Sequence, residues 1–304
     1  MTTTVSAVLE FDGPVVRYAD VERSDGRRRL ARLGRRHLGG PVFDRALRDG
    51  DADALSRVAA VIATSFSDVR ADRAVVVVHP PDVCSFFMPV ASSVSGAERK
   101  RQVTHQVALL AGVRSLEDLH LRVQTVRKDR TSDGDALDWL HVLAVPAAAH
   151  TRARRLFDGV DVPAVRWMLS TEAAARTAAG MTPSDAESSR APYGLTVGLY
   201  RQHSEYALVR DGAWTHGHAA LDVDSPQDRV YHVVALLNRL DIPLRQVGRL
   251  FAYGNADPDA LAVFEAVVQA DAERLRPFRL LSEWDDTVDP ATEGEYAACI
   301  GAGL

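Results

Sequence analysis

The stretch VSAVLEFDGPVVRYAD, residues 5–20, decides which fold class we expect for this chain. It contains two extended and partly alternating apolar runs, Val5–Phe11 and Pro14–Asp20, which Asp12-Gly13 separates. Asp-Gly between two such runs is a strong hairpin signal, because glycine tolerates the positive φ that a tight two-residue turn requires. The sequence therefore predicts a β-hairpin over residues 5–20.

The order of predicted elements that begins with this hairpin occurs twice along the chain. A helical period follows at 51–69, and the apolar run RAVVVVH at 73–79 suits a strand buried on both faces. Three further strands are predicted within 194–221, with a second Asp-Gly turn at 211–212, and a helix and a buried strand follow them. This duplicated order predicts an α/β protein with two related lobes, as in ribonuclease H-like folds.

The composition is that of an ordinary globular protein. The chain has 304 residues, of which 46% are hydrophobic and 25% charged, and two domains are usual for this length. Its net charge of −5 gives no electrostatic case for nucleic-acid binding, and its two cysteines, Cys84 and Cys299, lack partners at metal-ligand spacing. Apolar runs are far shorter than the roughly 20 residues of a membrane span, and residues 1–5 do not resemble a signal peptide. We therefore expect a cytoplasmic protein with free thiols and no transmembrane segment.

Four stretches of the sequence carry a resemblance to a known family. They are 75–80 with 83–89, 98–111, 140–146 with 162–165, and 296–304, which ends in a small-residue glycine motif. In this order they resemble the actin-like PilM and GspL family of type IV pilus and type II secretion assembly proteins, over nearly the whole chain. The resemblance implies an α/β, two-lobed actin-like (ribonuclease H-like) fold with a small inserted α+β subdomain in the first lobe.

The same resemblance implies how the chain divides. The expected parts are 1–93 for the first lobe, 94–162 for the inserted sheet-and-helix subdomain, 163–189 for the return to the first lobe and the linker, 190–290 for the second lobe, and 291–304 for a closing helix that returns to the first lobe.

The family's first nucleotide-binding turn corresponds to residues 10–17, and this chain departs from its pattern. Actin-like proteins bind phosphates at glycine-rich turns through backbone N–H groups, with an acidic residue that holds Mg²⁺ through water. Glu10 stands at the acidic position, Asp12 replaces the first glycine, and Gly13 remains. Pro14 has no N–H to donate, and Asp12 brings negative charge to the phosphate position. Both changes oppose phosphate binding.

The corresponding turn of the second lobe is altered as well. Thr196 stands where the family has an acidic residue, Gly198 is the glycine that remains, and bulky side chains follow it. Near the expected adenine site, the turn at Gly254 keeps a single glycine of a normally glycine-rich segment. We therefore expect a degenerate actin-like protein without catalytic residues and without a cofactor.

An actin-like ATPase is the alternative that the sequence leaves open, in which nucleotide-driven closure of the lobes gates partner binding. ATP and Mg²⁺ would then bind through rewired contacts, with Arg17 or Arg201 replacing the missing phosphate ligands. The cofactor-binding residues in that case would be Glu10, Asp12, Gly13, Arg17, Thr196, Gly198 and Gly254.

The resemblance also implies a partner. Members of the family bind the short cytosolic segment of an inner-membrane assembly protein, so we expect a non-catalytic adaptor held at the inner membrane through such a partner; a homo-oligomer is compatible with this role. The segment would dock by apolar anchors and edge-strand hydrogen bonds in a groove between the first lobe and the insertion. The residues expected to line that groove are Phe86, Phe87, Met88, Val103, Val107 and Leu110. By residue type alone, a place in the core is the better explanation of any single one of them.

Two further features have no assigned role. The basic segment Arg27–Arg36 could contact anionic lipid, an acidic partner or nucleic acid, or could be a solvated strand balanced by nearby aspartates. His216 and His218 share one face of a predicted strand, but the sequence specifies no third ligand for a metal. We therefore predict no metal site and no specific nucleic-acid partner.

Overall fold

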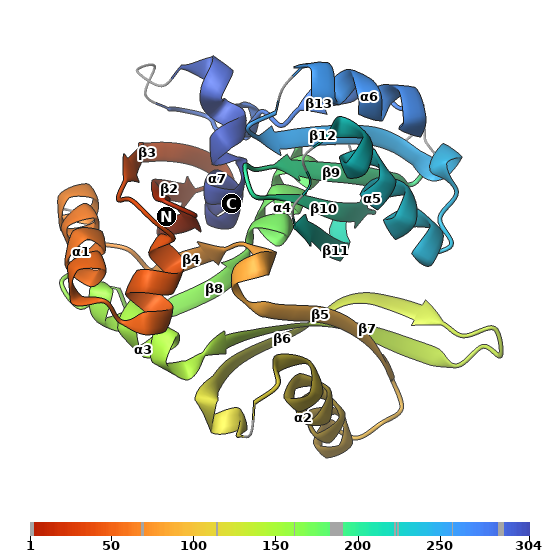
Figure 1. Cartoon of the computed structure of the whole chain (residues 1–304), viewed down its shortest axis with the longest axis horizontal. Coiled ribbons are helices and arrows are strands. Elements are labelled where there is room, and N and C mark those ends of the chain that lie inside the picture. Colours follow the sequence, from red (N-terminus) through yellow and green to blue (C-terminus); the bar gives the residue numbers. More distant parts are fainter. Residues whose placement is uncertain are drawn as a thin grey trace.

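Two five-stranded sheets with the same topology form the centre of the molecule. The computed structural model describes residues 3–67, 70–113, 115–160, 162–182, 191–221, 223, 225–256, 258–284 and 289–304. The strand order is β3-β2-β1-β4-β8 in the first sheet and β11-β10-β9-β12-β13 in the second. In each sheet the first three strands are antiparallel and the last two run parallel to the central one. This repetition confirms the predicted two-lobed α/β architecture (Figure 1).

Most strands of the two sheets follow from runs recognised in the sequence, whereas the strand at 272–274 was not predicted. Those of the first sheet are β1 (Thr4–Asp12), β2 (Val15–Ser24), β3 (Arg27–His37), β4 (Arg73–Val78) and β8 (Val165–Leu169). Those of the second sheet are β9 (Tyr193–Leu199), β10 (His203–Arg210), β11 (Ala213–Leu221), β12 (Val247–Gly254) and β13 (Ala272–Arg274). The first hairpin pairs Asp12 with Val15 across the predicted turn, where Gly13 has a φ of 51°.

The first sheet is covered on both faces, which explains why the run in β4 is apolar throughout. On one face lie a π-helical segment, η1 (Phe43–Asp49), and the helices α1 (Ala52–Phe66) and α3 (Ala147–Leu156), whose apolar side chains belong to one core cluster. The helices α4 (Ser170–Met181) and α7 (Ala297–Gly303) cover the other face, and α4 also packs against the second sheet. Consequently α4 lies between the two lobes (Figure 1).

The helix α7 explains the small-residue motif that ends the sequence. It packs against α4 and against β1 and β2, so this segment returns to the first lobe after the second. A Cβ atom on Gly301 would collide with the backbone oxygen of Ala173 and with Thr177 Oγ1 in α4. Glycine at this position therefore allows the two helices to approach closely.

The second lobe keeps its helices on its outer side. These are α5 (Pro226–Arg239) and α6 (Pro258–Val268), and α5 begins where the Ser225 hydroxyl accepts a hydrogen bond from Asp228 N. The 3₁₀ helices within the described residues are η2 (Pro80–Asp82), η3 (Leu116–Asp118), η4 (Leu244–Gln246), η5 (Pro277–Leu280) and η6 (Pro290–Tyr296). No helix in these described ranges is long and apolar enough to cross a membrane.

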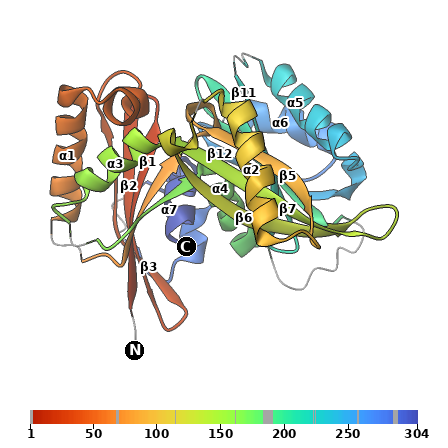
Figure 2. The same ribbon diagram turned by 90° about the horizontal axis from the view of Figure 1, so that it is seen from below.

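The inserted subdomain begins and ends earlier than the predicted range 94–162. It consists of β5 (Cys84–Ala91), α2 (Gly96–Ala111), β6 (Leu119–Arg130) and β7 (Ala136–Pro146), with the sheet order β5-β7-β6 and α2 across one face (Figure 2). The strand β5 pairs with β7, and α3 packs on the first lobe. The reason is that η2 turns the chain out of the first sheet directly after β4. Residues 183–189 of the predicted linker lie outside the described residues.

Candidate functional site

The turn of the first hairpin is held by an internal ion pair. Glu10 of β1 and Arg17 of β2 are register partners, and Arg17 Nη1 donates to Glu10 Oε1 at 3.3 Å and to Asp12 Oδ2 at 2.9 Å. Burial alone would lower the pKa of Arg17, but the carboxylates of Glu10 and Asp12 raise it above its ordinary value. The structure thus brings these three predicted residues together, with the guanidinium already occupied.

Glu205 of β10 lies at the meeting point of the two lobes and is fully buried. Its carboxylate accepts a hydrogen bond of 2.7 Å from the Ser170 hydroxyl at the start of α4, and another of 2.7 Å from the Tyr253 hydroxyl of β12. His79 Nδ1 lies 2.6 Å and His203 Nε2 3.1 Å from its Oε1. Burial would raise the pKa of Glu205, but His79 and His203 hold it well below its usual range. This carboxylate is therefore charged and has hydrogen-bond partners at both of its oxygens.

His79 connects the two lobes. It directly follows β4, and while its Nδ1 contacts Glu205, its Nε2 lies 3.5 Å from Glu10 Oε1 in the first lobe. Burial alone would lower the pKa of His79, but Glu205, Glu10 and Asp12 raise it well above 6.5. The imidazolium therefore sits between carboxylates of both lobes.

Aromatic rings fill the remaining space around these charges. Tyr200, in the turn between β9 and β10, stacks on His203 with ring centroids 4.7 Å apart and meets the ring of His79 edge-on at 4.6 Å. Its ring centroid is 6.0 Å from that of Tyr253. We call the following residues the interlobe cluster: Glu10, Asp12, Arg17, His79, Ser170, Tyr200, His203, Glu205 and Tyr253.

The remaining residues predicted for nucleotide binding have packing roles beside this cluster. A Cβ atom on Gly198 would lie 2.6 Å from the Tyr253 ring, so glycine makes room for that ring. Gly254 has a φ of +73°, and a Cβ atom there would lie 2.6 Å from Leu199 O. Thr196 is buried, and its hydroxyl donates to Ala207 O at 3.5 Å. Each glycine is thus explained by a close contact within the protein.

The residues predicted to bind a partner divide between the two faces of the inserted sheet. Phe86 and Met88 pack on the face that α2 covers, in the cluster around Val103 and Val107. Val103 and Val107 are buried there, so the prediction that these two line an open groove is wrong. Their inward position follows from the helical period of α2, which turns one face to the sheet. Leu110, on the other side of α2, is 53% exposed.

Phe87 points to the opposite face, because successive strand residues alternate. Its ring stacks on His216 of β11 at a centroid distance of 5.0 Å and meets Trp214 at 5.1 Å and His141 of β7 at 5.0 Å. Phe87 therefore joins the inserted subdomain to the second lobe. His218 lies further along β11, where no metal-ligating group is formed with His216 among the described residues.

The edge strand β6 joins the inserted subdomain to the first lobe. Arg122 forms bonds of 2.7 and 2.9 Å with the buried Glu172 carboxylate of α4 and donates to Trp167 O at 3.1 Å. Burial would raise the pKa of Glu172, but Arg122 lowers it below its usual range. The ring of His120 stacks on that of His150 in α3 with centroids 3.7 Å apart. The insertion is thus held against both lobes.

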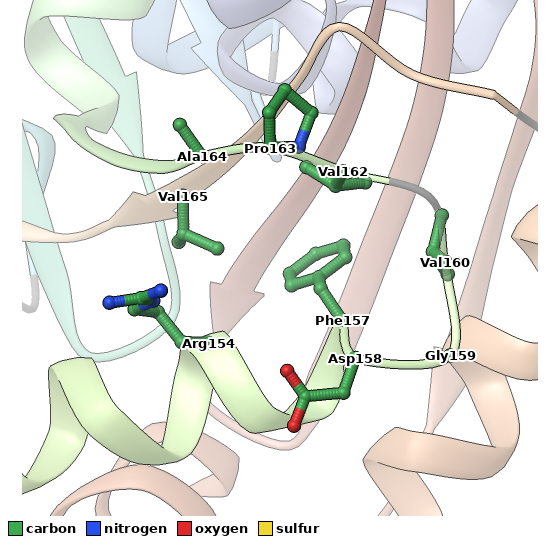
Figure 3. Close-up of a pocket in the computed structure, with 9 residues that line it drawn as sticks. All are labelled: Arg154, Phe157, Asp158, Gly159, Val160, Val162, Pro163, Ala164 and Val165. Atoms are coloured by element: carbon green, nitrogen blue, oxygen red, sulfur yellow. The ribbon is translucent and has the colours of Figure 1, made fainter.

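Two cavities lie near these joints. One, of about 460 Å³, opens between the end of α3 and β8, and Figure 3 shows the side chains of Phe157 and Val165 directed toward it. The other, of about 260 Å³, lies between the inserted subdomain and β11, where Phe87 and Thr171 contribute to its wall. The interlobe cluster lines neither of these two cavities.

The fold is actin-like. Its two lobes share one topology, a subdomain is inserted after β4, and helix α4 lies between the two sheets. Solved structures agree: a chain from the PilM-PilN type IV pilus biogenesis complex is similar at a TM-score of 0.73, with 11% identity over 98% of this chain and 97% of that one. A Bacteroides thetaiotaomicron protein with an actin-like ATPase fold and unknown function matches at a TM-score of 0.55, with 8% identity over 90% and 91% of the two chains. A weaker match, on which the assignment of the fold does not depend, is the cytoplasmic domain of EpsL, an inner-membrane component of the type II secretion system of Vibrio cholerae, at a TM-score of 0.42 with 12% identity over 98% and 94% of the two chains. No family model and no curated protein matches the sequence. The actin-like fold and the likeness to PilM that the sequence predicted are therefore confirmed.

His79 and the second-lobe half of the cluster were not predicted as site residues from the sequence. His203 and Glu205 alternate with a serine and therefore share one face of β10, which is a local signal. His79 directly follows an apolar strand, at the strand end where polar groups of parallel sheets gather. No local pattern shows that these two segments, which lie in different sheets, meet.

Proposed function

We propose that this chain is a non-catalytic adaptor of a pilus or secretion assembly platform. In this role it stays at the cytoplasmic face of the inner membrane by binding the cytosolic segment of a membrane protein. The observation that carries the proposal is the interlobe cluster, since the chain's own ion pairs and rings occupy the junction between the lobes, where actin-like proteins bind nucleotide.

The charges of the cluster argue against a bound nucleotide. A triphosphate at the first turn would meet the carboxylates of Glu10 and Asp12, and Arg17 would have to leave both of them to pair with it. Removing one partner of a buried ion pair costs about 3–5 kcal/mol, because a charge is left uncompensated. Tyr200 would also have to leave its stacked position on His203. Phosphate binding therefore requires several internal contacts to break.

The partner role is supported by the likeness to a chain from the PilM-PilN complex and by the surface of the insertion. Both β5 and β6 are edge strands of the inserted sheet, and an extended peptide can add its backbone hydrogen bonds to such an edge. Leu109 and Leu110 at the end of α2 are 64% and 53% exposed, next to each other. Apolar side chains that are exposed together on a folded protein often mark a contact surface.

A thermal-shift titration with Mg-ATP tests the absence of nucleotide binding. We expect no change in Tm up to millimolar ATP. If ATP bound, a concentration of 100 times Kd would stabilise the protein by about 2.7 kcal/mol, which would be plainly visible. Stabilisation of that size would favour the ATPase alternative.

A binding measurement tests the partner role. The probe is a synthetic peptide with the cytosolic segment of the PilN-like membrane protein from the same genome, titrated by fluorescence anisotropy. We expect the double variant Leu109→Asp with Leu110→Asp to bind at least tenfold more weakly at an unchanged Tm. The matched control is Leu221→Asp in the second lobe, where the leucine is 60% exposed. Equal affinity of the unmodified chain and both variants would show that the contact surface lies elsewhere. Absence of binding by the unmodified chain would contradict the adaptor role.

A further inference from the structure

Three metal-ligating side chains converge in the interlobe cluster. His79, His203 and Glu205 each offer one ligand atom, and these atoms all lie within 4.8 Å of one another. His79 comes from the first lobe, whereas His203 and Glu205 come from β10 of the second. Two imidazoles and one carboxylate are a ligand set that proteins use for zinc, with a fourth position left to water or another group.

The groups behind these ligands are arranged as in metal sites. A ligating imidazole usually directs its second nitrogen to a carboxylate, which fixes the ring and raises its basicity. His79 has this arrangement, since its Nδ1 faces Glu205 and its Nε2 lies 3.5 Å from Glu10 Oε1. The hydroxyls of Ser170 and Tyr253 hold the Glu205 carboxylate in place at 2.7 Å. The ligands are therefore oriented before any ion binds.

The charge of the cluster also suits a divalent cation. Glu10 and Glu205 are fully buried and Asp12 is partly buried, while Arg17 is the guanidinium that pairs with the first hairpin's carboxylates. Three carboxylates and one guanidinium leave a formal charge of −2, which one divalent ion would neutralise.

An ion would reach the site from the side of His203. Its side chain is 10% exposed, whereas those of His79 and Glu205 are 2% and 0% exposed. The hydroxyl of Tyr200 is buried and makes no hydrogen bond to any described residue, and its ring stacks on His203. An ion entering past His203 would meet His79 and Glu205 directly behind it.

We propose that His79, His203 and Glu205 bind one divalent transition-metal ion of the zinc class, which links the two lobes. This ion would be structural, since its ligands come from both lobes and are almost completely enclosed. The short contact between His79 and Glu205 would open slightly to admit the ion between them.

Metal titration of the full-length, tag-free and EDTA-treated protein tests this site. We expect one equivalent of Zn²⁺ per chain in competition with a chromophoric chelator, and a rise in Tm. Co²⁺ should give the visible absorption of a four-coordinate site. His203→Asn should lose this binding at least a hundredfold, while His37→Asn, which changes an exposed histidine at the end of β3, should retain it.

The variant His203→Cys separates ligation from folding. Cysteine is a zinc and cobalt ligand, so this variant should still bind one equivalent and should add a sulfur-to-cobalt charge-transfer band. That band appears only if position 203 contacts the metal. Absence of one-equivalent binding by the unmodified protein, or equal binding by His203→Asn, would overturn the proposal. The result is independent of the adaptor role, which the peptide titration tests.

Discussion

The imidazole of His79 lies 2.6 Å from the carboxylate of Glu205, and this contact joins the end of β4 in the first lobe to β10 in the second. Both side chains are buried. In actin-like proteins that bind nucleotide between the lobes, the ligand itself joins the two halves. In this chain a side-chain pair already makes that connection.

Glu205→Gln should strongly destabilise the protein. The amide removes the negative charge that faces His79, and it cannot accept from all of the donors that converge on the carboxylate. Breaking a buried pair in this way costs about 3–5 kcal/mol, which urea unfolding would show as a lower midpoint. Glu117→Gln, at an exposed glutamate in η3, is the matched control and should change stability by less than about 0.5 kcal/mol. Similar midpoints for both variants would show that the pair contributes little.

Asp20 of β2 should make the protein less stable as the pH rises. Its side chain is buried, and burial and the nearby Glu22 raise its pKa from 3.8 to about 6. The folded protein therefore binds this proton more tightly than the unfolded chain, so the stabilisation is complete below about pH 4 and is lost as the pH rises through 6.

Asp20→Asn removes this loss, because the amide does not ionise. At pH 7 the variant should be more stable than the unmodified protein by about 2–3 kcal/mol, since each unit of pKa shift corresponds to about 1.4 kcal/mol. At pH 4 the two proteins should differ little. Urea unfolding of both proteins between pH 4 and pH 8 measures the difference in their free energies of unfolding. If this difference does not increase with pH, the raised pKa of Asp20 is contradicted.

Gly301→Ala should separate α7 from α4. The added methyl group would meet the backbone oxygen of Ala173, which cannot move without shifting its helix. Overpacking of this kind costs about 1–3 kcal/mol. Gly96→Ala at the start of α2 is the control, because a Cβ atom there has no neighbour within 4 Å. Equal thermal stability of the two variants would mean that α7 adjusts its position freely.

Phe87→Ala should loosen the inserted subdomain. The ring contacts Trp214 and His216 of the second lobe, so its loss leaves a void at that joint. Because Phe87 is only partly buried, we expect a cost of about 2 kcal/mol, below the 3–5 kcal/mol of a fully buried phenylalanine. Hydrogen exchange should become faster in β11 and β5. If exchange rises in the insertion alone, the ring does not transmit stability between the two parts.

The outline of the fold could be predicted because its signals are local. Asp12-Gly13 fixes the first hairpin, and the apolar run of β4 shows that this strand is covered on both faces. The predicted start of the insertion, residue 94, is too late, because β5 already belongs to the inserted sheet through its pairing with β7. That partner lies about fifty residues further along the chain, and nothing within 84–91 reveals the pairing. The same limit applies to the cluster. Glu10 and Arg17 are neighbours across a tight turn, whereas His79 and Glu205 come together only once both lobes have formed and packed.

The position of α7 has a consequence for how this chain is made. Residues 297–303 complete the core of the first lobe, yet they leave the ribosome after the whole second lobe. The second sheet draws all its strands from 193–274, so it can form during synthesis while β1 and β2 still lack a cover on one face. Until α7 is in place, the core cluster that contains Val8, Ala19 and Val21 lacks the side chains that α7 contributes to it. The first sheet is therefore complete only after the chain has passed through the whole second lobe.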